Sequence, residues 1–131
     1  MAHGSRASSL RASIAYAQGG YFLLTGLWPL LSIKTFQLVT GPKTDLWLVK
    51  TVGVVVAAIG ATLVMAGSRR QQAPEIPLLG ISSAAALGGI DLVYVAKGRI
   101  ARVYLLDALA EAGVIACWLA ELMHSRQQGI A

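Results

Sequence analysis

Hydrophobic residues dominate four segments of this chain, and short polar stretches separate them. The segments span residues 14–33, 46–66, 76–96 and 103–123. Each is about as long as the roughly 20 apolar residues that cross the hydrocarbon core of a bilayer as a helix. The pattern predicts an all-α fold, an integral membrane four-helix transmembrane bundle with both termini on the same side.

The stretches outside these segments are polar. Residues 1–13 form the expected N-terminal tail and residues 124–131 the C-terminal tail, which leaves 14–123 as a single transmembrane domain. The first apolar run is longer than the core of a cleaved signal peptide, so we expect it to remain as a helix. Pro29 should kink its last turn because proline removes a backbone donor. The longest loop, residues 34–45, contains a Gly-Pro turn signal.

Composition supports a multi-pass integral membrane protein. Only 13% of the 131 residues are charged and 56% are hydrophobic, whereas soluble domains carry about a quarter charged residues. The net charge of +5 is spread among helix ends. No run gathers the Lys and Arg of a nucleic-acid patch, so the expected counter-charge is the headgroups of the lipid bilayer. Cys117 is the single cysteine, which rules out an intramolecular disulfide.

The basic residues do not decide the orientation. The terminal side of the bundle would hold five of them, and the opposite side would hold five or six, depending on where Lys50 is counted. Orientation normally follows an excess of Lys and Arg on the cytoplasmic side. A near-tie leaves two alternatives, a fixed orientation set by other details and a dual topology in which copies insert both ways.

Four charged residues fall inside the apolar segments: Lys50, Asp91, Asp107 and Glu111. At 1.5 Å rise per residue, all four belong to the half of the bundle away from the termini. Asp107 and Glu111 are four residues apart and share one helix face. Charged side chains within a membrane are costly and mark functional sites unless a partner explains them. With Tyr94 and Tyr104 as hydrogen-bond donors, these residues form the candidate ligand or ion pocket.

Small residues predict where the helices pack. Gly53 and Gly60 are seven residues apart on the second segment, and the third segment carries the series Gly80, Ala84 and Gly88. Such faces let membrane helices approach closely. Lys50 lies three residues from the first of these faces and Asp91 three residues from the second, so we expect both to point inward.

A simpler interpretation covers part of this set. Lys50 is close enough to the headgroups to snorkel, and Asp91 and Asp107 are shallow enough to meet water or basic loop residues. Glu111 lies two to three turns deep and cannot easily reach water. Three carboxylates beside one lysine cannot all stay ionised in a low dielectric, which makes Glu111 the strongest functional candidate.

Three functional hypotheses follow. The first is binding or translocation of a small molecule or ion in this pocket, with the 34–45 loop over its mouth. The second is an accessory or assembly subunit of a larger membrane complex, and the third an intramembrane enzyme acting on a lipid-soluble substrate. Nothing in the sequence identifies a catalytic residue or a cofactor. His3 and His124 lie in the tails, and no spacing suggests a metal site. The small faces also predict contact with a second copy or a partner membrane subunit, unless packing within the chain uses them.

Overall fold

The computed structural model describes residues 2–69 and 73–130, which form helices joined by loops, with no strand among them. The five helices are α1 (Ala2–Leu31), α2 (Ile33–Thr40), α3 (Leu46–Gly67), α4 (Glu75–Ala96) and α5 (Tyr104–Ile130). The prediction of an all-α protein is confirmed. Met1, residues 70–72 and Ala131, which belong to the expected tails and to the polar loop after the second segment, lie outside the described residues.

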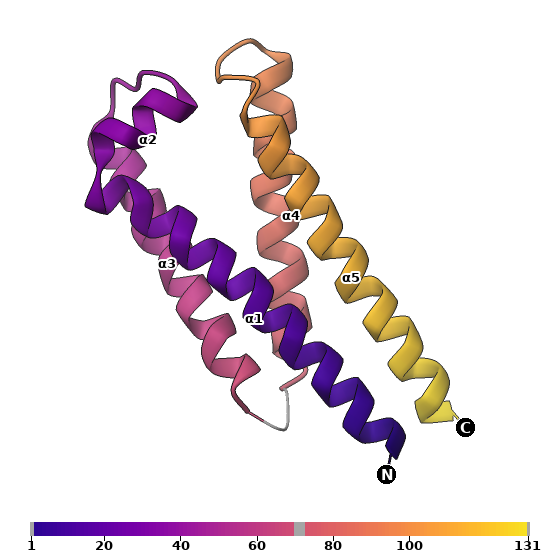
Figure 1. Ribbon diagram of the computed structural model, residues 1–131. Helices are drawn as coiled ribbons and strands as arrows, with labels where there is room; N and C mark the ends of the chain where they lie inside the picture. The colour runs from indigo at the N-terminus through magenta and orange to yellow at the C-terminus, as the bar shows by residue number, and fades with distance from the viewer. Residues whose placement is uncertain (1, 70–72, 131) are drawn as a thin grey trace.

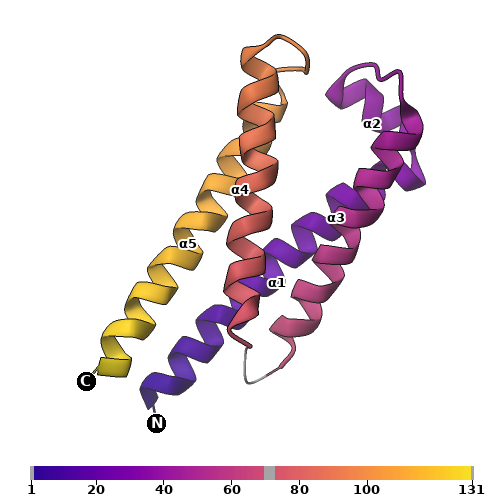
Figure 2. The same cartoon turned by 180° about the vertical axis from the view of Figure 1, so that it is seen from behind.

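The helices form two antiparallel pairs, α1 with α3 and α4 with α5 (Figure 1). The pairs meet at the end of the molecule where α1 begins and α5 ends, and they diverge toward the end that carries α2 and the α4–α5 loop. Figure 2 shows the same arrangement from behind, with the start of α1 and the end of α5 again side by side.

Glycines determine how closely α1 and α3 approach. A Cβ atom on Gly19 would lie 2.7 Å from the backbone oxygen of Gly60, and one on Gly26 would lie 2.6 Å from the backbone oxygen of Gly53. No real Cβ atom tolerates such distances, so the two backbones touch. The residue numbers run in opposite directions along the two helices, as antiparallel packing requires. Both glycine pairs are spaced by seven residues, which keeps them on one face.

Glycines also lie between α4 and α5. Gly80 faces the Trp118 indole, and a Cβ on Gly88 would lie 3.2 Å from the Cβ of Glu111. Gly98, with a positive φ of 70°, follows α4, and the N–H of Arg99 closes the helix end by bonding to the Tyr94 carbonyl at 2.9 Å. This pattern is typical of a Schellman cap.

The expected 34–45 loop contains a helix instead. Ser32 separates α1 from α2. Its side chain accepts a hydrogen bond from the Thr35 N–H and so caps the N-terminus of α2. Pro29 lies in the last turn of α1, and α2 leaves that helix at an angle of 113°. The Trp28 indole holds α2 in place by donating to Thr35 Oγ1 at 2.9 Å and by meeting the Phe36 ring edge-on.

Two other boundaries differ from the sequence pattern. α1 begins at Ala2 rather than near residue 14, and α5 continues to Ile130 rather than ending near 123. The expected polar tails are therefore additional helical turns, since polarity alone does not end a helix. By length and composition α3 and α4 can each cross a membrane, and a third span results if α1 and α2 count as one broken span.

Candidate ligand-binding cavity

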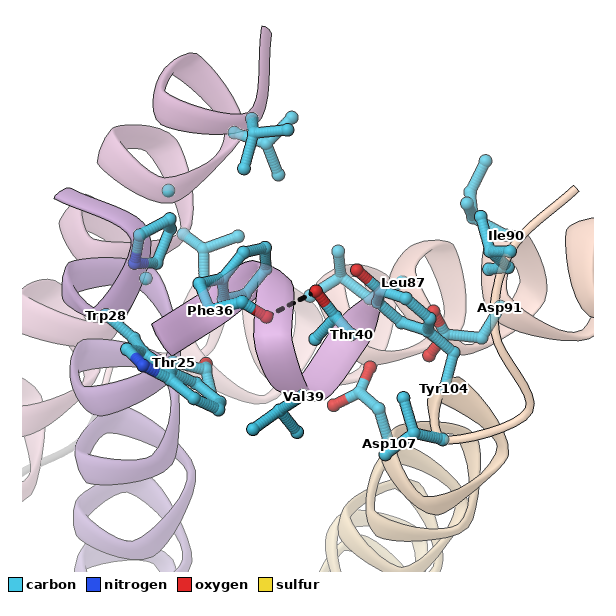
Figure 3. A pocket seen from close by; sticks show the side chains of 18 of the residues that line it. Thr25, Trp28, Phe36, Val39, Thr40, Leu87, Ile90, Asp91, Tyr104 and Asp107 are labelled. Carbon is cyan, nitrogen blue, oxygen red and sulfur yellow. Dashed lines mark hydrogen bonds between the residues drawn. The ribbon is translucent and has the colours of Figure 1, made fainter. Parts of the chain in front are cut away.

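A cavity of about 700 Å³ lies between the two helix pairs, in the half of the molecule away from the termini. Every helix contributes to its lining. Figure 3 shows Thr25, Trp28 and Phe36 on one side of it and Asp91, Tyr104 and Asp107 on the other. The side formed by α1, α2 and α3 is largely apolar and aromatic.

The opposite side carries three carboxylates. Asp91 comes from α4, and Asp107 and Glu111 come from successive turns of α5. Gly88 lets α5 approach α4 beside Glu111, and Asp91, one turn further along α4, reaches the same wall. The Tyr21 hydroxyl of α1 donates a hydrogen bond to Asp107. The cavity therefore has an aromatic side and an acidic side.

Glu111 is the most unusual residue of this wall. Its side chain is 1% exposed, and neither carboxylate oxygen has a hydrogen-bond partner among the described residues. Asp91 is 6% exposed, and its Oδ2 is unpartnered in the same part of the chain. A buried polar group without a partner costs about 1–3 kcal/mol, and a charged one costs more. Residues this costly need an explanation such as a bound ligand.

The outer end of the cavity contains a lysine. Lys43 Nζ donates to the carbonyl oxygens of Thr40 and Gly41 at 3.0 and 3.2 Å and lies 5.1 Å from the centre of the Tyr104 ring. The Thr40 hydroxyl in turn donates to the Phe36 carbonyl at 2.7 Å (Figure 3). The ammonium group of Lys43 therefore binds these groups, and it forms no ion pair with Glu111 in the described part of the chain.

The inner end, near the termini, is closed by a separate polar network. Gln18 is buried between the helix pairs, donates to the Gly80 carbonyl at 2.9 Å and accepts from the Trp118 indole at 2.8 Å. One step closer to the termini, Arg11 pairs with buried Glu121 at 2.7 Å. Sequence reasoning missed this network. The available signal is a lone glutamine in an apolar run, directly before two glycines.

The structure brings only part of the predicted set together. Asp91, Asp107, Glu111 and Tyr104 all line the cavity. Lys50 does not: its side chain is exposed on the outside of α3. The close glycine contact between α1 and α3 leaves no room for a lysine on that face, and Lys50 lies on the exposed side of α3. The expectation that it points inward is corrected.

Tyr94 also lies outside the cavity. Its ring is 38% exposed near the end of α4, with the Lys97 ammonium 5.6 Å from its centre. Sequence reasoning did not identify Tyr21, Thr25 or Lys43, all of which line the cavity. Tyr21 and Thr25 are four residues apart, and such i, i+4 polar pairs in an apolar helix are the available signal.

The described residues contain no group of three or more His, Cys, Asp and Glu side chains arranged to hold a metal ion. On the acidic wall, Asp107 lies close to the side chains of both Asp91 and Glu111. Comparisons with protein-family models, curated proteins and solved structures return no match for this chain.

Proposed function

We propose that this protein is a multi-pass integral membrane protein that binds a small molecule between its two helix pairs. The observation that carries the proposal is Glu111, which lines a cavity of about 700 Å³ and has no partner for either carboxylate oxygen among the described residues. Cavities of about 300–1,000 Å³ with apolar walls and a few polar groups are typical of small-molecule sites.

The distribution of polar and apolar side chains supports the membrane setting. Leu31 and Leu38 are 82% and 83% exposed, whereas Gln18, Glu111 and Glu121 are 1% exposed. In water this arrangement would be unfavourable, because large apolar side chains face out and charged ones face in. In a bilayer it is the expected one, since the apolar surface meets lipid and the polar groups are shielded.

The binding hypothesis accounts for Glu111 better than an accessory role does. Under the accessory hypothesis the buried charges pair within the chain or with a partner helix. Glu121 does pair within the chain, with Arg11. Glu111 has no partner among the described residues, and it lines the cavity between the helix pairs rather than the outer surface on which a partner helix would pack. Translocation would also require the Gln18–Trp118 contact to open, so we propose binding alone.

Filling the cavity tests this function. Ala110 lines the cavity, and Ala112, two residues along the same helix, is exposed and does not. We expect mild-detergent preparations of the wild type and of Ala112→Trp to retain the same small molecule in mass spectrometry, and Ala110→Trp to lose it. Equal small-molecule content in all three folded proteins would contradict the proposal.

A further inference from the structure

The charge and shape of the cavity narrow the class of ligand. Each carboxylate of the acidic wall carries a negative charge when ionised, and Lys43 is the one basic residue among the described residues that line the cavity. That lysine bonds to two backbone carbonyls and faces the Tyr104 ring. Among the described residues it forms no ion pair with Glu111. A ligand that enters therefore meets three carboxyl groups, not all of which can be ionised together, and no basic side chain pairs with them among the described residues.

The opposite side of the cavity favours a ligand with an apolar body. Tyr21, Phe22, Trp28 and Phe36 present aromatic rings from α1 and α2. Aromatic faces attract cations as well as apolar surface, and the effect grows when water is excluded. An inorganic cation would need several converging oxygen atoms, and the described carboxylates do not provide them.

Neutral and anionic ligands fit this lining less well. A neutral apolar molecule would leave the buried oxygens of Glu111 and Asp91 without a partner, at the cost described above. A fatty acid or another anion would place its negative charge beside an ionised carboxylate in a low dielectric, and this repulsion raises the free energy of the complex further. A cation with an apolar body satisfies both sides at once.

We infer that the cavity binds a hydrophobic organic cation, whose positive charge lies against Glu111 and Asp91 and whose body lies against the rings of Tyr21, Phe22, Trp28 and Phe36. This inference rests on the proposed function and specifies its ligand class. It assigns Glu111 the role of counter-ion, since that residue is the most buried of the three carboxylates and has both oxygens free of protein partners among the described residues.

A matched pair of ions tests the sign of the charge. Tetraphenylphosphonium and tetraphenylborate have nearly the same shape and opposite charge. Equilibrium dialysis against the purified full chain in detergent, corrected for protein-free micelles, measures both. We expect saturable tetraphenylphosphonium binding and at least about tenfold weaker tetraphenylborate binding, because a buried like charge opposes the anion.

Variants then test whether Glu111 is responsible for the preference for the cation. Glu111→Gln keeps the side-chain size and should weaken tetraphenylphosphonium binding by about tenfold or more, since the buried counter-charge is lost. Glu121→Gln is the matched control, because Glu121 is equally buried on the same helix but pairs with Arg11 outside the cavity. It should bind like the wild type. If it does not fold, Asp45→Asn, an exposed position outside the cavity, takes its place.

The outcomes separate this inference from the proposed function. Equal or tighter binding of tetraphenylborate, or tetraphenylphosphonium binding that Glu111→Gln leaves unchanged, overturns the cation inference. The proposed function still stands in that case if Ala110→Trp removes the copurified molecule. Absence of binding by either ion also overturns the cation inference, and the Ala110→Trp comparison again decides separately whether the cavity binds anything.

Discussion

At the scale of single residues, two buried polar side chains have opposite relations to their surroundings. Gln18 bonds to the Gly80 carbonyl and to the Trp118 indole, and so joins α1 to α4 and α5. Glu111, as deeply buried, accepts no hydrogen bond among the described residues and lies beside the carboxyl group of Asp107. Satisfied buried polar groups specify one packing arrangement. We therefore assign Gln18 to the stability of the closed end and Glu111 to a ligand.

Replacing Gln18 should destabilise the protein. Gln18→Leu leaves the Trp118 indole N–H and the Gly80 carbonyl without this partner, which costs about 1–3 kcal/mol. The midpoint of thermal unfolding in a fixed detergent should fall clearly below that of the wild type. Thr62→Val is the control, because exposed Thr62 bonds, among the described residues, to the carbonyl one turn back in its own helix. Similar unfolding midpoints for the two variants would contradict the stabilising role that we assign to Gln18.

Side-chain spacing predicted the acidic wall but not its neighbours. Asp107 and Glu111 share a face by helix periodicity alone, and Asp91 joins them because Gly88 lets α5 come near. The direction of Lys50 could not be predicted, since it depends on how tightly α1 packs against α3. Tyr21 was missed because its partner, Asp107, is 86 residues away in sequence. Such contacts depend on tertiary packing that local patterns do not contain.

At the scale of elements, α1 and α3 share the most extensive contact among the described helices, and α2 is the least expected helix. The pair depends on Gly19 and Gly26 of α1 meeting Gly60 and Gly53 of α3. The sequence showed the seven-residue spacing on α3, and the same spacing on α1 identifies the partner helix. For α2, the cavity-lining positions Phe36, Val39 and Thr40 follow helical spacing. The segment is too short to span a membrane, and its Gly-Pro turn signal predicts a loop.

Adjacent glycines on α1 provide a test of this contact. Gly19→Ala would place its Cβ 2.7 Å from backbone atoms of Gly60 and Val64, which forces the helices apart and should cost about 1–3 kcal/mol. Gly20→Ala meets nothing within 4 Å and should stabilise the helix by roughly 0.5–1 kcal/mol. Thermal unfolding midpoints should therefore move in opposite directions. Equal midpoints would show that α1 and α3 do not touch at Gly19.

At the scale of the whole molecule, the two helix pairs give the chain a closed end and a divergent end (Figure 1). The start of α1 and the end of α5 lie at the closed end, where Arg11 pairs with Glu121. The cavity lies toward the divergent end, with Lys43 and the α2–α3 loop beside it. If the molecule spans a membrane in this form, the termini and the outer end of the cavity face opposite sides.

Single cysteines can measure this arrangement. Cys117 is the only cysteine and is exposed, so Cys117→Ala gives a background without thiols. Ser9→Cys and Ser125→Cys mark the closed end, and Thr44→Cys marks the α2–α3 loop. None of these changes alters the charge balance. In intact cells, a membrane-impermeant maleimide should either label both Ser9→Cys and Ser125→Cys but not Thr44→Cys, or label Thr44→Cys but neither of the other two.

The same experiment distinguishes the two orientations that the charges leave open. A fixed orientation gives complete labelling of one class of cysteine and none of the other. The near-equal number of basic residues at the two ends provides little bias, and a dual topology would label every position to about half of the value reached in lysed cells. Labelling of Ser9→Cys without Ser125→Cys would place the termini on opposite sides. The paired-helix arrangement would then not be the one that spans the membrane.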